Sequence, residues 1–505
     1  MRKIKRKIPA TMATQHPDHA GKPYWYSGTF IPVTEEAKEA FLSFSELGIS
    51  EYKWDWEGKL VDESVLERLL GAYFDYFKKF PIGKEKFLTF RLPNPKVQTE
   101  FRLSRALMGI ASAAGLAKQV GLHSPPLFEV ILPMTETAEE MVSIQEAFKE
   151  IACLRHPLNR MEKGCNVFLE IIPLFESVDI ILNSTKILEK YLRLYHKKFN
   201  ARPEYLRPYV ARSDPALNSG IVPTILSIKV ALSRYKKFEN KHNLPLFPVI
   251  GVGTLPFRGG INPQKPERFI KEYPGVRTAI IQSAFRYDFP KKMVIKAIAK
   301  LERELPKTHP VIINKSDETS LIKTIKYFEK EYQNTIAGIA PLVNRVAAYM
   351  PKRRERVQHV GLFGYSRGVG KVKLPRAISY TAALYSLGVP PELIGTGRGL
   401  AKAKKDGTLP LVEKHYTNLK HDLYFAGKFL YKPGLEKLAK TSPAWGNIRQ
   451  DVLEIESYLG HPLCAKYLNE QEHQLISAKI HKLLKGKKNI TPLIEQSALL
   501  RKSLG

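Results

Sequence analysis

Three segments between residues 167 and 260 decide the expected fold: VFLEIIPLFES at 167–177, YLRPYVARSDPALNSG at 205–220 and LPLFPVIGVGTLPFRGG at 244–260. Each begins with apolar residues and reaches a charged residue beside Pro, Gly or Ser, namely Glu176, Asp214 and Arg258. Because amphipathic stretches long enough for helices separate the segments, each apolar run is expected to be a strand of a parallel sheet. Two carboxylates and an arginine would then stand at the carboxyl ends of three consecutive strands.

The same alternation of apolar runs and helical patterns continues over most of the chain. In chain order, the candidate strands are 51–56, 86–91, 127–132, 167–172, 205–211, 246–252, 278–285 and 359–365. Helical patterns occupy 64–80, 97–121, 137–156, 178–199, 221–242, 290–304, 318–332, 334–350 and 376–388. Eight strands close a (β/α)8 barrel.

We therefore predict an α/β fold, a TIM-type (β/α)8 barrel with many additional helices at the N-terminus, before strand eight and at the C-terminus. The 505 residues are expected to form a single domain over 1–505. In this interpretation the barrel covers about 48–400, and a helical C-terminal part covers about 401–505.

The composition narrows the class of protein. The formal net charge is +31, from 80 Lys+Arg against 49 Asp+Glu, which favours nucleic acid, acidic membrane surfaces or small anionic substrates as partners. Three cysteines without CxxC spacing indicate a reducing cytoplasm and no disulfide framework. The basic N-terminus is followed by no apolar signal region, and no run is long enough to span a bilayer. We expect a cytoplasmic protein with no membrane partner.

Charged and polar residues follow every candidate strand, where a barrel places its active site. In chain order they are Asp55, Arg91, Thr135 with Glu136, Glu176, Asp214, Arg258, Arg286 with Asp288, and Arg367. Mg²⁺ is commonly held by one or two carboxylates, which Glu176 and Asp214 could supply. The alternatives are that Glu176 caps a helix and that Asp214 starts an Asx turn. Several converging arginine forks suit a dianion, although each Arg alone is equally consistent with a surface ion pair.

A histidine in TMATQHPDHA (11–20) is the candidate for proton transfer. His16 stands in this irregular stretch before any candidate strand, and His19 fits equally well on spacing alone. GTGRGL (395–400) is rich in glycine but follows a helical pattern, so it is only weakly similar to a phosphate loop. The chain contains no Walker, GxGxxG, HExxH or GxSxG motif in a suitable context.

Five stretches, in the same order along the chain, resemble phosphoenolpyruvate carboxylase in its short archaeal-type form. TMATQHPDHA resembles the family's histidine motif, and IIPLFES resembles the motif whose Glu binds the metal. VARSDPALNSG is similar to the motif that supplies the second ligand, and LPFRGG to the arginine loop. GYSRGVGKVKLPRAISY (364–380) resembles the later arginine region.

The resemblance implies a role for each matching residue. It implies His16, Arg258 and Arg367 as catalytic residues, with His16 handling the proton of carboxyphosphate. It implies Glu176 and Asp214 as ligands of Mg²⁺ or Mn²⁺. The substrate-binding residues that it implies are Arg91, Arg376, Arg286, Gln282, Gly259 and Gly260.

The implied activity is that of a carboxy-lyase in anaplerotic carbon fixation. Phosphoenolpyruvate and bicarbonate would give oxaloacetate and inorganic phosphate through carboxyphosphate and a metal-stabilised enolate, and the family forms homotetramers. One alternative is another Mg²⁺-dependent barrel enzyme that forms an enolate, of the pyruvate kinase or citrate lyase kind. The other is a basic nucleic-acid-binding protein, which the net charge and KRRER (352–356) favour. Because the basic residues are scattered without a recognition module, we expect no nucleic-acid partner.

Overall fold

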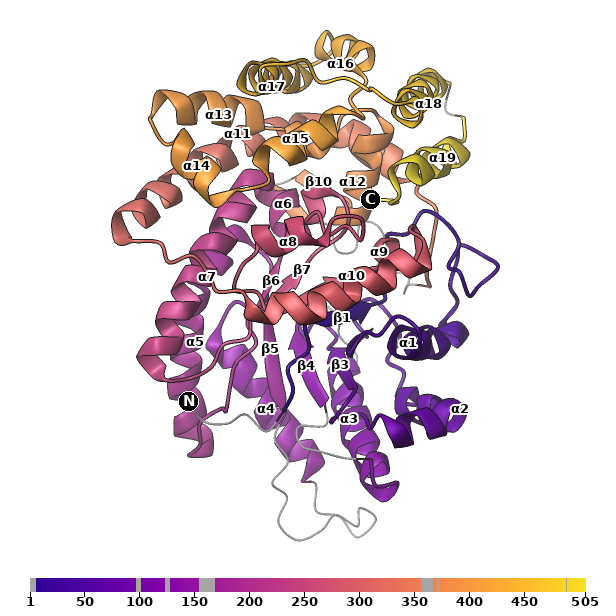
Figure 1. Cartoon of the computed structure of the whole chain (residues 1–505), viewed down its shortest axis with the longest axis vertical. Helices are drawn as coiled ribbons and strands as arrows, with labels where there is room; N and C mark the ends of the chain where they lie inside the picture. Colours follow the sequence, from indigo (N-terminus) through magenta and orange to yellow (C-terminus); the bar gives the residue numbers. More distant parts are fainter. Residues whose placement is uncertain are drawn as a thin grey trace.

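The computed structural model describes residues 6–96, 101–122, 128–153, 169–355, 367–369, 372–486 and 488–505. Eight parallel strands form a closed barrel, which confirms the predicted fold (Figure 1). They are β1 (Thr11–Thr14), β2 (Glu51–Asp55), β3 (Phe87–Arg91), β4 (Phe128–Leu132), β5 (Glu170–Phe175), β6 (Tyr209–Ala211), β7 (Val249–Gly251) and β8 (Thr278–Ile281).

The barrel is closed by a strand that the sequence reasoning missed. Within β1, Met12 pairs with Glu51 of β2, and Thr11 pairs with Ala279 of β8. The prediction that the barrel starts near residue 48 is therefore wrong. The predicted eighth strand, 359–365, lies outside the described residues, and the eight strands of the closed barrel do not include it. The physical reason for the miss is that TMAT is short and half polar, so it lacks an apolar run.

Helices cover the outside of the barrel. They are α1 (Glu36–Ser45), α2 (Val65–Lys79), α3 (Arg102–Gln119), α4 (Ala138–Ala152), α5 (Val178–Phe199), α7 (Ile221–His242), α8 (Pro266–Glu272) and α10 (Lys291–Glu304). Thr137 and Glu140 form a capping box at the start of α4, as its sequence predicts. Asn200 and Asn243 adopt left-handed conformations that end α5 and α7, because Asn tolerates this conformation.

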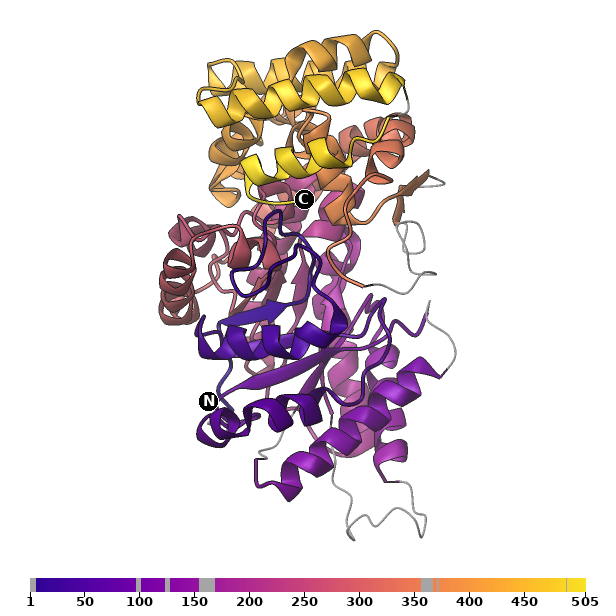
Figure 2. The ribbon, with the colours of Figure 1, turned by 90° about the vertical axis from the view of Figure 1, so that its right-hand side faces the viewer.

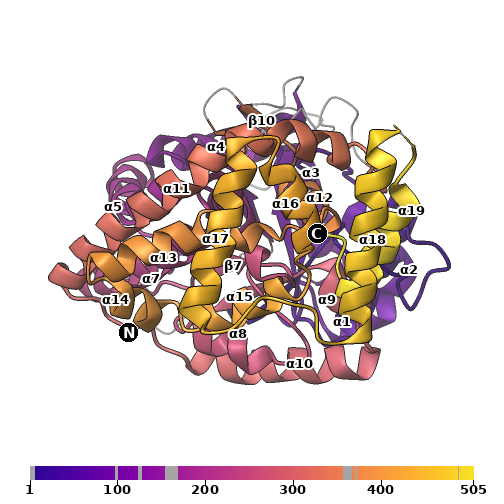
Figure 3. The ribbon, with the colours of Figure 1, turned by 90° about the horizontal axis from the view of Figure 1, so that it is seen from above.

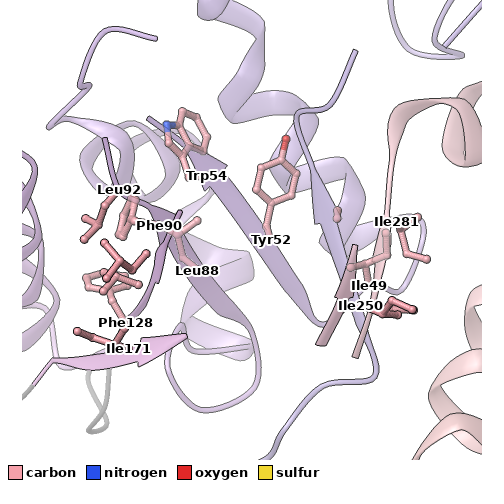
Figure 4. Close-up of a cluster of buried hydrophobic side chains, with 14 of the residues drawn as sticks. Ile49, Tyr52, Trp54, Leu88, Phe90, Leu92, Phe128, Ile171, Ile250 and Ile281 are labelled. Carbon is pink, nitrogen blue, oxygen red and sulfur yellow. The ribbon is translucent and has the colours of Figure 1, made fainter. Parts of the chain in front are cut away.

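The inside of the barrel contains both an apolar cluster and buried charged side chains. The apolar residues are Met12, Ile131, Ile172, Leu174, Tyr209, Ala211, Val249 and Ile280. Among the charged side chains, Arg207 pairs with Glu51 and Glu129 near the amino ends of the strands. Side chains on the outer faces of the strands, including Trp54 and Phe90, pack into the main core beneath the helices (Figure 4).

A helical layer covers the carboxyl end of the barrel (Figures 2 and 3). It contains α11 (Lys315–Ala347), α12 (Ala377–Ser386), α13 (Thr396–Lys405), α14 (Leu409–His415), α15 (Leu419–Gly427), α16 (Lys432–Ala439), α17 (Pro443–Leu459), α18 (Leu468–Lys485) and α19 (Thr491–Arg501). The helix α12 lies against α6 (Ser213–Ser219), and α15 lies against the short helix η2 (Pro256–Arg258). The helices predicted before strand eight follow the last barrel strand instead, and 318–332 and 334–350 form the single helix α11.

The glycine-rich GTGRGL segment is a packing element. The carboxylate of Asp451 in α17 accepts hydrogen bonds from the amides of Gly395 and Arg398, at 2.8 and 2.9 Å. A side chain on Gly399 would overlap the ring of Phe328. A buried protein carboxylate thus occupies the place that a phosphate would need, so the weak similarity to a phosphate loop does not indicate a ligand site.

Gly399→Ala is expected to lower the free energy of unfolding by about 1–3 kcal/mol, because the added methyl group overpacks the core. Gly446→Ala is the matched control, since a Cβ there meets nothing within 4 Å. It lies inside α17 and should raise stability by roughly 0.5–1 kcal/mol. Urea unfolding of both variants measures the two values, and a stable Gly399→Ala variant would contradict the packing interpretation.

Two further expectations concern the cysteines and the membrane. Cys153 is disulfide-bonded, so the expectation of a chain without disulfides is wrong at this position. Cys464 is free and exposed. Within the described parts of the chain, no helix is both long enough and apolar enough to cross a bilayer.

Candidate active site

Charged groups from several strand ends influence the hydroxyl group of Tyr209 in β6. Burial raises the pKa of Tyr209, the Arg91 guanidinium lowers it, and the carboxylates of Glu176, Asp55 and Asp214 raise it further. All four groups stand at or just after the carboxyl ends of their strands. The carboxyl ends of β2, β3, β5 and β6 therefore converge as the barrel predicts.

His16 belongs to this site and follows β1 directly, rather than standing in a loop outside the barrel as predicted. Its Nδ1 lies 2.9 Å from the Thr14 hydroxyl oxygen. Burial lowers the pKa of His16 well below its usual value, and the cations Lys53 and Arg91 lower it further. The imidazole is therefore neutral near pH 7 and can accept a proton.

The structure decides between the two candidate histidines. His19 is fully buried, and its Nε2 lies 2.8 Å from the carbonyl oxygen of Thr29. Burial lowers the pKa of His19 to about 3. His19 thus packs within the N-terminal segment, and His16 is the candidate for proton transfer.

An NMR titration of the protein with ¹³C-labelled histidine is expected to show a His16 signal that stays neutral well below pH 6.5. The sign follows from burial and from the two neighbouring cations, all of which disfavour the imidazolium. The His16→Asn variant assigns the signal by its loss. A His16 midpoint at or above 6.5 in the free protein would contradict this electrostatic description.

Arg258 is buried in η2, and each of its guanidinium nitrogens has a partner. The Nε donates to the Ser213 hydroxyl at 3.1 Å, and Nη2 donates to Gln282 Oε1 at 2.6 Å. The Nη1 donates to Asp18 Oδ2 at 3.3 Å and to the carbonyl oxygen of Gly505. These partners come from distant parts of the chain and fix the orientation of the guanidinium. Gln282, predicted to bind substrate, holds Arg258 in this structure.

The amides of the two glycines after Arg258 form hydrogen bonds within the turn. They donate to Pro256 and Leu255, each at 3.0 Å, so they are not available to a ligand in this arrangement. Gly259 has a φ of +122°, and a side chain there would overlap Val252. Backbone conformation and packing thus already require glycine at 259, and the substrate-binding role of Gly259 and Gly260 stays a prediction.

Arg91 lies at the end of β3 but is neutralised by acids. Its Nε and Nη2 bond both oxygens of Asp55, at 2.7 and 2.5 Å, and Nη1 lies 2.6 Å from Glu57. These contacts indicate that Arg91 organises the carboxylates of the site. Its substrate-binding role stays a prediction.

Arg286, a further residue predicted to bind substrate, also has protein partners. It is fully buried in α9 (Ser283–Tyr287) after β8. Its guanidinium donates to the Ser43 hydroxyl at 2.8 Å, to Glu39 at 2.9 Å and to the Thr14 carbonyl oxygen at 2.7 Å. Arg286 therefore connects β1 to α1 through the protein's own groups.

Glu176 and Asp214 are the two carboxylates predicted to hold a divalent cation, and they follow the neighbouring strands β5 and β6. Glu176 is 7% exposed, and its Oε2 accepts a hydrogen bond from the Met134 amide at 3.0 Å. The cap of α5 is Ser177, which accepts from the Ile180 amide, so the helix-cap alternative for Glu176 is excluded. The described residues contain no cluster of three His, Cys, Asp or Glu that could hold a metal. Two carboxylates suffice for Mg²⁺ when water and substrate complete its shell.

Two more predicted arginines lie on elements next to Asp214. Arg367 begins β9 (Arg367–Val369), which pairs antiparallel with β10 (Val372–Leu374). The strand β9 lies against α6, whose first turn contains Asp214. Arg376 occupies the N-cap position of α12, which also lies against α6.

Lys53 is a candidate that the sequence reasoning missed. It is fully buried on β2, in register with Thr14 of β1 and Thr89 of β3, and its charge acts on His16. The signal was present, because EYKWDW places Glu51, Lys53 and Asp55 on one face of a strand. Charged residues at alternating positions of a buried strand indicate a polar barrel interior.

The two described arginines of the KRRER segment do not contribute to a nucleic-acid surface. Arg353 and Arg354 are each 3% exposed. Arg353 donates to the carbonyl oxygens of His19 and Ala20, and Arg354 forms ion pairs with Glu36 and Glu39. The positive charge of both side chains is used inside the protein.

A barrel whose catalytic end presents a neutral histidine, paired carboxylates and buried arginines is typical of an enzyme that acts on a small anion with a divalent cation. The family model described as phosphoenolpyruvate carboxylase matches residues 8–505. This chain belongs to the phosphoenolpyruvate carboxylase family, as its motifs predicted.

Curated relatives agree with that assignment. The phosphoenolpyruvate carboxylase of Leuconostoc mesenteroides is 39% identical over 504 residues, with 99% of each chain covered. That of Oenococcus oeni is 38% identical over 509 residues, with 100% of each chain covered. That of the archaeon Metallosphaera sedula is 36% identical over 519 residues, which cover 99% of this chain and 100% of the relative. The pyruvate kinase-like and citrate lyase-like alternatives are thereby set aside.

Proposed function

We propose that this chain carboxylates phosphoenolpyruvate with bicarbonate to give oxaloacetate and inorganic phosphate. The observation that carries the proposal is the position of His16, Glu176, Asp214 and Arg258 directly after the barrel strands β1, β5, β6 and β7. Membership of the phosphoenolpyruvate carboxylase family supports it.

The reaction is a phosphoryl transfer followed by a carboxylation. A bicarbonate oxygen attacks phosphorus, and the bond between phosphorus and the enol oxygen breaks, which leaves carboxyphosphate and the enolate of pyruvate. His16 accepts the proton of carboxyphosphate. The bond between the carboxyl carbon and the phosphate oxygen of carboxyphosphate then breaks to give CO₂ and phosphate. The enolate carbon then attacks CO₂, and the proton on His16 passes to the departing phosphate.

Glu176 and Asp214 would hold Mg²⁺ or Mn²⁺ in this proposal. When bound, the divalent ion supplies positive charge next to the developing oxyanions. Arg258, Arg367 and Arg376 would bind the anionic groups of the substrates. The helical layer over the barrel would exclude water, which matters because protonation of the enolate gives pyruvate instead of oxaloacetate.

The deciding experiment is an oxaloacetate assay coupled to malate dehydrogenase, with phosphoenolpyruvate, bicarbonate and Mg²⁺. Oxaloacetate formation that needs all three supports the proposal. A parallel binding titration with DNA and RNA at increasing salt tests the nucleic-acid alternative. Salt-sensitive binding without any oxaloacetate formation would overturn the proposed function.

We also propose the assembly and location that the family resemblance implies. The active form would be a homotetramer in the cytoplasm, with phosphoenolpyruvate and bicarbonate as its small-molecule partners. Analytical ultracentrifugation of the active protein tests the assembly, and a monomer with full activity would contradict it.

A further inference from the structure

Arg354 is the meeting point of two buried ion pairs on α1. Its Nη1 donates to Glu36 Oε1 at 3.2 Å, and its Nη2 donates to Glu39 Oε1 at 2.5 Å. The exposed fractions of the three side chains are 0% for Arg354, 2% for Glu36 and 0% for Glu39. A main-chain bridge between Ile31 and Arg354 fixes the residue against the N-terminal segment. Each carboxylate begins a separate path towards His16.

The first path runs through Arg286. The Glu39 Oε1 accepts from Arg286 Nη2 at 2.9 Å, and the same Nη2 donates to the carbonyl oxygen of Thr14 at 2.7 Å. The hydroxyl of Thr14 lies 2.9 Å from His16 Nδ1. The pKa of Glu39 is affected first by burial, which raises it, and then by Arg354 and Arg286, which together lower it to about 2. Glu39 is therefore charged throughout the range in which the protein works.

The second path runs through Lys59. Its ammonium group pairs with Glu36 and donates to Gln15 Oε1 at 3.3 Å. The same Gln15 oxygen accepts from the Asp55 amide at 3.0 Å. The two paths thus end on Thr14 and Gln15, the two residues that precede His16.

We propose that Arg354 is a positioning residue that holds His16 for proton transfer by joining these two paths, an inference that rests on the proposed function. The reason is geometric. His16 must accept a proton from a short-lived intermediate beside the enolate, and a small misplacement of a catalytic group costs a large part of the rate. Buried ion pairs fix Thr14 and Gln15 more firmly than a loop alone would.

The ion pairs that remain in the two paths indicate how removal of the Arg354 side chain would affect the protein. Glu39 retains Arg286, and Glu36 retains Lys59, when Arg354 is removed. No buried carboxylate is then left without a cation, so the substitution avoids the large cost of an unpaired buried charge. The connection between the two paths is lost, and the position of His16 changes more than the stability of the fold.

Arg354→Met is expected to lower kcat for oxaloacetate about tenfold and to change KM for phosphoenolpyruvate by less than about twofold. The ratio of pyruvate to oxaloacetate is expected to rise several-fold, because a slower release of CO₂ leaves the enolate exposed to protonation for longer. The two products are measured in parallel reactions, pyruvate with lactate dehydrogenase and oxaloacetate with malate dehydrogenase. The product ratio identifies positioning, because partial unfolding lowers the yield of both products equally.

Arg207→Met is the matched control. Arg207 is equally buried and pairs with two carboxylates, Glu51 and Glu129, at the opposite end of the barrel. It is expected to lower the thermal midpoint without changing the product ratio. Glu39→Gln and Glu36→Gln each interrupt one path and are expected to raise the ratio by less than Arg354→Met does. They provide the same readout if Arg354→Met does not fold.

The possible outcomes distinguish a positioning role of Arg354 from a purely structural role and from failure of the proposed function. If the wild-type protein forms oxaloacetate and the product ratio stays unchanged in Arg354→Met and in both Glu→Gln variants, Arg354 is only structural and the inference is overturned. If the wild-type protein forms no oxaloacetate, the proposed function itself fails. A raised ratio in the Arg354, Glu39 and Glu36 variants, absent in Arg207→Met, supports the positioning role.

Discussion

Replacing His16 with Asn is expected to lower the rate of oxaloacetate formation by about a thousandfold. Asn retains a polar group near the Thr14 hydroxyl but cannot accept a proton at neutral pH. Binding of phosphoenolpyruvate and Mn²⁺ should persist, because neither Glu176 nor Asp214 is changed. Steady-state kinetics, together with Mn²⁺ binding measured by electron paramagnetic resonance, separates the two effects.

Phosphate release distinguishes the step that is lost. If His16 acts only on carboxyphosphate, bicarbonate-dependent phosphate release should outlast oxaloacetate formation in the variant. His19→Asn is the matched control, because His19 is three residues further along the same segment and bonds Thr29. It should retain carboxylation even where it loses stability. Carboxylation at the full rate by His16→Asn would remove His16 from the mechanism.

Glu176→Gln is expected to weaken Mn²⁺ binding by at least roughly tenfold, because a neutral amide replaces one of two carboxylates in the proposed metal site. The substitution keeps the size of the side chain and an oxygen that can accept from the Met134 amide. Structural loss should therefore be small. Electron paramagnetic resonance of free Mn²⁺ measures the affinity without depending on turnover.

Asp179→Asn provides the control for Glu176→Gln. Asp179 is in the first turn of α5, close to Glu176 in sequence, but its exposed carboxylate pairs with Lys326. Removal of its charge should leave the Mn²⁺ titration unchanged. An unchanged titration in Glu176→Gln as well would show that Glu176 does not bind the metal.

The seven strands from β2 to β8 were predictable, because most of them carry an apolar run and β2 alternates charged with aromatic residues. The strand β1 was not, since TMAT contributes only two apolar side chains. Its neighbours β2 and β8 define it, and those contacts are distant in sequence. For the same reason His16 was expected in a loop before the barrel.

The arginines show a second limit of prediction from sequence, which concerns the partners of each side chain. Arg91, Arg258 and Arg286 look alike as charged residues after strands, yet their partners differ completely in the fold. The pairing of Arg91 could have been foreseen, because adjacent strands in register place it opposite Asp55. The partners of Arg258 and Arg286 come from distant segments, and only the tertiary structure identifies them.

The pairing of β1 with β8 also determines when the barrel can be completed during synthesis. The segment containing Thr11 leaves the ribosome long before its partner around Ala279 exists. Until then one edge of β1 and the growing edge of the sheet both lack their neighbour, and unpaired edges favour association with other chains. Arg258 adds a later requirement, because it bonds both Asp18 and Gly505. A nascent chain therefore acquires its full set of active-site contacts only after residue 505 has been added.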